Sequence, residues 1–135
     1  MTREECITKI KEMLTLGEAV KAAIEVYSAA KADAVALYGS EESIPSDSPV
    51  GKQLAAARAK AACLAVRKSA ATAAIYPHYV RLKTRDRKAV DVHYGEGKSI
   101  AETAKALGIT DRCVCYRVER AVSKILAMIN DLEQN

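Results

Sequence analysis

Residues 99–122 read SIAETAKALGITDRCVCYRVERAV, and this stretch decides the fold of the C-terminal part of the chain. Ser99 and Glu102 stand three positions apart at the start of a periodic run, which is the spacing of a capping box. Gly108 favours the left-handed backbone conformation that ends a helix. A helix is therefore expected between these residues. The positions that should face inward are Ile100, Thr103, Ala104 and Leu107.

A second helix is expected to begin at Thr110, whose side chain suits the N-cap position. Its inward positions, at helical spacing, are Val114, Val118, Val122 and Ile125. The small Ala104 faces the turn, Gly108 follows four positions later, and Val114 six positions after that. This spacing is the helix-turn-helix pattern, in which two helices cross closely. The start of the second helix then stays free to enter a DNA major groove.

The remainder of the chain has a composition that favours helices. Of its 135 residues 25 are alanine, and phenylalanine and tryptophan are absent. Alanine has the best helix propensity and buries little surface, which favours thin, closely packed helices. Helices are expected over residues 3–16 and 18–38, with Gly17 ending or bending the first.

A loop rich in serine, proline and acid follows at residues 39–49. Ser48 and Pro49 suit the cap and the first position of a long alanine-rich helix, and Pro77 should break it. We therefore expect an all-α protein: an N-terminal helical hairpin and a long helix, followed by a helix-turn-helix bundle. The expected segments are 1–48 with the linker at its end, 49–76 as the connecting helix, and 77–135 as the DNA-binding domain.

The charges are unevenly distributed along the chain. Residues 52–88 hold ten basic side chains and one acidic one, whereas residues 1–51 hold five basic and nine acidic. A basic block of this kind, placed before a helix-turn-helix, indicates a polyanion as partner. Double-stranded DNA is the partner that both features favour.

Several classes of protein are not expected. No apolar run reaches the length of a membrane span, and the charged start is unlike a secretory signal, so a cytoplasmic protein with reduced thiols is expected. Cys113 and Cys115 are two apart on a helix and do not share a face, so no metal site and no cofactor is expected. The acids are scattered along helices, and we expect no enzyme.

The segment around the helix-turn-helix resembles a known family. Residues 85–99 (RDRKAVDVHYGEGKS) resemble the approach helix and turn of the fourth region of bacterial sigma factors, and residues 100–110 (IAETAKALGIT) resemble its first motif helix. Val114, residues 117–121 and residues 124–125 are similar to its recognition helix. The resemblance covers about a third of the chain. It implies a module that reads a promoter-like element and touches RNA polymerase, as in phage and mobile-element transcriptional regulators.

Base-reading residues are expected at the start of the second motif helix. Arg112 matches the O6 and N7 atoms of guanine, and Tyr116 can touch a thymine methyl or a phosphate. Asp111 either accepts from cytosine or only favours the helix N-terminus. Cys115 is small enough to let the backbone approach the groove. The residues expected to contact phosphate are Lys83, Arg85, Arg87, Lys88, Lys98, Thr110, Arg117 and Arg120. For Arg117 an ion pair with an acid on a neighbouring helix is the alternative.

The predicted function is that of a sequence-specific DNA-binding transcriptional regulator. One alternative is a DNA recognition protein of the phage terminase small-subunit type, and another is an adaptor that binds RNA polymerase and not DNA. An apolar stripe continues past the motif through Ile125, Met128, Ile129 and Leu132. It either packs on the N-terminal helices or pairs two chains, and a homodimer is expected.

Overall fold

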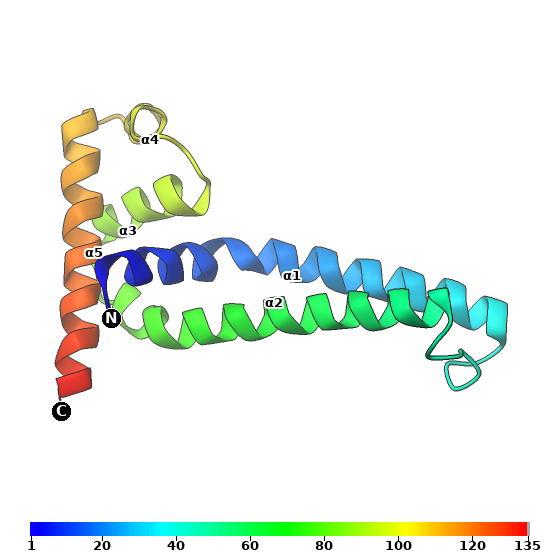
Figure 1. Cartoon of the computed structure of the whole chain (residues 1–135). Coiled ribbons are helices and arrows are strands. Elements are labelled where there is room, and N and C mark those ends of the chain that lie inside the picture. The colour runs from blue at the N-terminus through cyan, green and yellow to red at the C-terminus, as the bar shows by residue number, and fades with distance from the viewer. Residues whose placement is uncertain (135) are drawn as a thin grey trace. The chain divides into compact units, whose positions relative to one another are not determined.

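The computed structural model describes residues 1–134 and contains only helices and loops in this range (Figure 1). The helices are α1 (Arg3–Tyr38), α2 (Pro49–Tyr79), α3 (Thr84–Val90), the π-helical turn η1 (Asp91–Gly95), α4 (Ile100–Leu107) and α5 (Asp111–Gln134). The expected all-α class is thereby confirmed. No helix in this range combines the length and the apolar character that a membrane span requires.

The chain divides into two compact units. We call Leu16–Arg67 the hairpin unit, and Met1–Thr15 together with the chain from Lys68 onward the head unit. Helices α1 and α2 each contribute residues to both units, so these boundaries differ from those expected at 48 and 76. The physical reason is packing, because Cys6 and Ile10 from the first turns of α1 are fully buried in the core of the head unit.

Two expected helix ends do not occur. Helix α1 continues through Gly17, because a glycine inside a helix costs only about 1 kcal/mol relative to alanine. Helix α2 continues two residues past Pro77, because a proline in the last turn removes only one hydrogen bond of the ladder and no long run of helix follows it. The start of α2 is as expected: the Ser48 hydroxyl accepts a hydrogen bond of 3.0 Å from the N–H of Gly51.

The core of the head unit joins the start of α1 and the end of α2 to the helix-turn-helix. Helices α3 and α4 both pack against α5 (Figure 1). The four inward positions expected on α5 are all buried, as are Thr103 and Ala104 of α4, while Ile100 and Leu107 are half-buried against the same core. The largest fully buried aliphatic side chains are Ile10, Ile75, Val90, Val114, Val122 and Ile125.

The apolar stripe at the end of α5 packs on the N-terminal part of the chain. Ile129 is buried in the head core, and Met1 packs against the same cluster. The N-terminal amine donates to Oδ1 of Asn130 at 3.3 Å and pairs with the carboxylate of Glu133. Of the two expected arrangements, the stripe thus adopts packing on the N-terminal part of the chain. Leu132 remains exposed.

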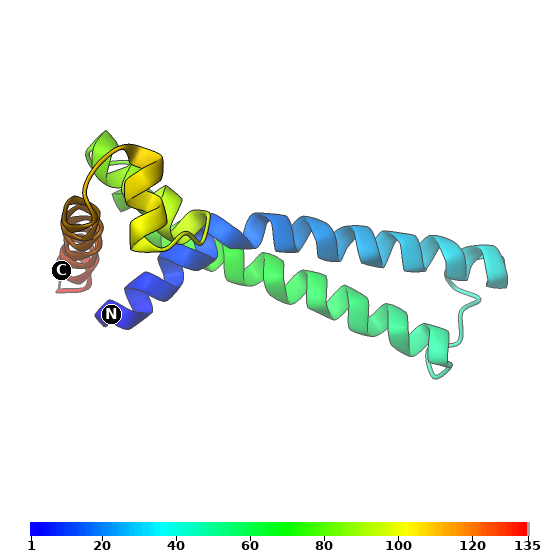
Figure 2. The ribbon, with the colours of Figure 1, turned by 90° about the horizontal axis from the view of Figure 1, so that it is seen from above.

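The hairpin unit consists of segments of α1 and α2 that run side by side in opposite directions (Figures 1 and 2). Residues 39–48 connect them. Within this unit only Ala23, Ala34 and Gly51 are buried. The loop packs closely on the start of α2, because a Cβ atom added at Gly51 would stand 2.2 Å from the carbonyl oxygen of Pro45.

Candidate nucleic-acid interface

Helices α4 and α5 form the helix-turn-helix through the local hydrogen bonds that the sequence predicts. The Ser99 hydroxyl accepts from the N–H of Glu102, and the Glu102 carboxylate accepts from the N–H of Ser99, both at 3.1 Å. The backbone hydrogen bond from Ser99 lowers the pKa of Glu102. Gly108 adopts φ 68° and ψ 34°, and the Thr110 hydroxyl accepts from the N–H of Cys113 at 3.2 Å.

The start of α5 presents an open face. Asp111, Arg112, Cys115 and Tyr116 are all exposed, and Tyr116 is the largest of the apolar ones, with 63% of its surface accessible. The buried Val114 faces the other way, into the core. All four residues expected to read bases therefore lie on the accessible side of the helix that a helix-turn-helix offers to a groove.

Arg120 makes a different contact from the phosphate contact expected of it. Its Nε donates to Oδ2 of Asp86 at 2.9 Å and its Nη2 donates to Oδ1 at 2.6 Å. Asp86 is fully buried, and the Arg120 side chain is about one-third exposed, at 33%. The hydrogen bonds with Asp86 raise the pKa of Arg120. This two-pronged ion pair ties α3 to α5 and holds the helix that carries the exposed residues.

Tyr116 is connected to the same ion pair. The Arg120 guanidinium lies 5.0 Å from the centre of the Tyr116 ring, a cation–π distance. Asp86, Arg120 and Tyr116 thus form a chain from the core of the head unit to its surface. The Arg120 guanidinium, which the buried Asp86 holds in place, thus positions the Tyr116 ring on the open face of α5.

Three of the residues expected to bind phosphate meet at one hollow. Arg85 and Lys88 of α3 and Arg117 of α5 line it, together with Thr84 and Leu107. The three cationic side chains come from two helices and surround a single depression. Such an arrangement is suited to an anionic oxygen cluster such as a backbone phosphate.

The other expected phosphate ligands are arranged separately. Lys83 is exposed beside the start of α3, Arg87 is half-buried, and Thr110 is engaged in capping α5. Lys98 lines a different hollow, with His93 and Tyr94 among its walls, and its ammonium group stands 3.5 Å from the Glu96 carboxylate. Lys98 therefore does not join the basic hollow.

The turn η1 is fixed by two contacts. The Tyr79 hydroxyl donates to the carboxylate of Asp91. Burial, followed by this hydrogen bond, raises the pKa of Tyr79 well above its ordinary value. Nδ1 of His93 lies 2.7 Å from the carbonyl oxygen of Lys98. These contacts hold the connection between α3 and α4, and hence the approach to the motif.

Residues 80–125 match the family model described as sigma-70, region 4. The resemblance expected from the sequence is confirmed for this segment, which runs from just before α3 to Ile125 of α5. Comparisons with curated proteins and with solved structures gave no match. The hairpin unit lies outside this region 4-like segment, as does the start of α1.

Sequence reasoning assigned no role to Asp86, which the structure places in the ion pair with Arg120. A signal was present, because Asp86 is the single acidic residue among ten basic ones in residues 52–88. In residues 1–134, no group of three or more histidine, cysteine or acidic side chains is arranged to hold a metal ion.

Proposed function

We propose that this protein is a DNA-binding transcriptional regulator that places the start of α5 in the major groove. The observation that carries the proposal is the open face of Asp111, Arg112, Cys115 and Tyr116 on a region 4-like helix-turn-helix. The hollow lined by Arg85, Lys88 and Arg117 supports it, because it adds a cationic site on the same unit.

The roles of the side chains follow from their chemistry. Arg112 donates to O6 and N7 of a guanine, and Asp111 accepts from the amino group of a cytosine. Tyr116 contacts a thymine methyl, and Cys115 leaves room for the backbone to approach. Phosphates are bound at the basic hollow and by the nearby Lys83, which position the protein without reading sequence. Arg120 positions α5 and Tyr116 and is not assigned a phosphate.

The family match also motivates a finer proposal about partners and setting. We propose a regulator of the phage or mobile-element type that acts in the cytoplasm and touches RNA polymerase through the region 4-like segment. The match to sigma-70 region 4 supports polymerase contact, because that region belongs to a polymerase-associated factor. A packaging protein of the terminase small-subunit type would instead assemble as a ring of many subunits.

The proposal is tested by selecting a preferred duplex from a random pool and measuring affinity for it and for a scrambled duplex. The wild-type chain should prefer the selected duplex by about a thousandfold or more. Arg112→Ala should reduce that preference by roughly tenfold to a hundredfold. Lys88→Ala should weaken binding to both duplexes alike. Lys21→Ala, an exposed cation of the hairpin unit outside the basic block, is the matched control and should change neither.

Two outcomes would contradict the proposal. An equal loss on both duplexes for Arg112→Ala would remove its base-reading role. Failure of the wild-type chain to bind any duplex at low salt, combined with binding to RNA polymerase, would favour the adaptor function. Binding that does occur should weaken steeply with salt, since log K falls by about 0.9 per phosphate contacted for each unit of log salt.

A further inference from the structure

The hairpin unit has no large side chain that is fully buried. Its 52 residues, Leu16–Arg67, bury only the small residues Ala23, Ala34 and Gly51. Its larger apolar side chains, such as Val20, Leu54 and Leu64, are only half-buried, so burial within the unit is small against the entropy cost of ordering so many residues. Large apolar side chains of the unit remain exposed: Ile24, Val26, Leu37 and Val66. A hairpin of this composition needs a partner surface.

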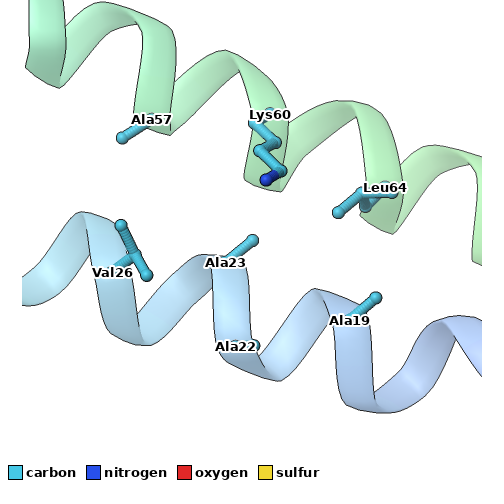
Figure 3. Close-up of a pocket in the computed structure, with 7 residues that line it drawn as sticks. All are labelled: Ala19, Ala22, Ala23, Val26, Ala57, Lys60 and Leu64. Atoms are coloured by element: carbon cyan, nitrogen blue, oxygen red, sulfur yellow. The ribbon is translucent and has the colours of Figure 1, made fainter.

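An apolar groove lies between the two helices of the hairpin unit. Side chains of α1 (Ala19, Ala23 and Val26) point toward α2, and those of α2 (Ala57, Lys60 and Leu64) point toward α1 (Figure 3). Lys60 is the single charged residue among the seven that line the groove. The alanine side chains that line the groove are short, so another helix can approach it closely.

The charges of the hairpin indicate what fills the groove. Residues 16–47 carry six acidic and two basic side chains, whereas residues 48–67 carry four basic and no acidic ones. One side of the hairpin is thus negative and the other positive. The exposed acids on α1 include Glu18, Glu25 and Asp33, and the exposed cations on α2 include Arg58 and Lys60.

We propose that the groove docks the hairpin of a second copy of this chain, so that two hairpin units form a four-helix bundle. A twofold axis places α1 of one copy against α2 of the other, and the same contact occurs twice. Both pairings join an acidic helix to a basic one. Because both complementary contacts form within one pair, the assembly closes at two chains, and the grooves of both copies become the bundle core.

The first test measures the mass of the full chain by sedimentation at micromolar concentrations, without DNA. Wild type should sediment as a dimer. Val26→Gln, in the groove, should raise the dimer dissociation constant by about a hundredfold, because the symmetric dimer loses two buried valines and each costs about tenfold. Val66→Gln is the matched control, because Val66 is equally apolar, similarly exposed and outside the groove lining. It should leave the constant within about twofold.

The second test remains decisive even where a single variant loosens the hairpin. One chain carries Glu18→Lys and Glu25→Lys, and the other carries Arg58→Glu and Lys60→Glu. Each chain alone should dimerise less than wild type, because the substituted side chains then carry the same charge as the helix that they face. An equimolar mixture should form a mixed dimer, which a mass tag on one chain identifies. The mixture should also show a stronger helical circular dichroism signal than either variant chain alone.

Three results would overturn the inference. If the wild-type chain stays monomeric at tens of micromolar, the groove does not bind a second copy of the chain. Equal behaviour of the two valine variants removes the groove from the interface, and a mixture that does not recover excludes the pairing of α1 with α2. None of these measurements involves DNA, so they are independent of the proposed regulator function.

Discussion

The ion pair between Asp86 and Arg120 yields an asymmetric prediction. Asp86 is fully buried and receives two hydrogen bonds from Arg120, whereas the Arg120 side chain remains one-third exposed, at 33%. Asp86→Asn leaves the Arg120 guanidinium free to be hydrated. The free energy of unfolding should therefore fall by the contribution of the charge-assisted hydrogen bonds, about 1.5–3 kcal/mol. Arg120→Met leaves a buried carboxylate without a counter-charge, and it should therefore destabilise more than Asp86→Asn does.

The free energy of unfolding is to be measured by urea denaturation followed by circular dichroism. Hydrogen exchange in α3 assigns the loss to the head unit, because a chain of two units need not unfold in one step. The double variant Asp86→Leu with Arg120→Met should recover much of the stability lost by Arg120→Met alone, since it removes the stranded charge.

Arg120→Lys separates a positioning role from a phosphate contact. Lysine keeps the positive charge but cannot make the two parallel bonds that a guanidinium makes. We expect it to destabilise α3 and to weaken DNA binding. Stability equal to wild type for Arg120→Lys, or a larger loss for Asp86→Asn than for Arg120→Met, would refute the reasoning.

Three further predictions concern local contacts. Ser99→Ala should destabilise α4 by about 1 kcal/mol through loss of the N-cap, measurable as faster hydrogen exchange in residues 100–104, with Ser123→Ala on the exposed face of α5 as the control. Because the folded pKa of Glu102 is lowered, its contribution to stability is complete above its ordinary value of 4.5 and is lost as pH falls through the lowered value. Glu102→Gln should therefore lose less stability than wild type on acidification, and parallel pH curves would contradict the capping box. Gly51→Ala should loosen the start of α2, because the added Cβ would stand 2.2 Å from the Pro45 oxygen, and unchanged exchange across residues 45–52 would count against this close approach.

The motif itself was predictable because its hydrogen bonds are local. The capping box of Ser99 and Glu102, the left-handed Gly108 and the cap by Thr110 each involve residues within a few positions of one another. The inward valines follow from helical periodicity alone. Expectations about Gly17 and Pro77 were wrong as helix ends, because a glycine costs only about 1 kcal/mol within a long helix and Pro77 lies two residues from the end of α2.

The contacts between segments far apart in sequence were not predictable in the same way. The sequence by itself determined the all-α class, the helix-turn-helix and the exposed start of α5, since propensity, caps and periodicity act within one or two helical turns. Only the tertiary structure decided that Cys6 and Ile10 belong to the head core, and that Asp86 engages Arg120 across 34 positions. It also decided that Arg85, Lys88 and Arg117 share one hollow. The physical reason is that charge and apolarity along the chain set what each side chain favours, while the packing of the helices selects its partner.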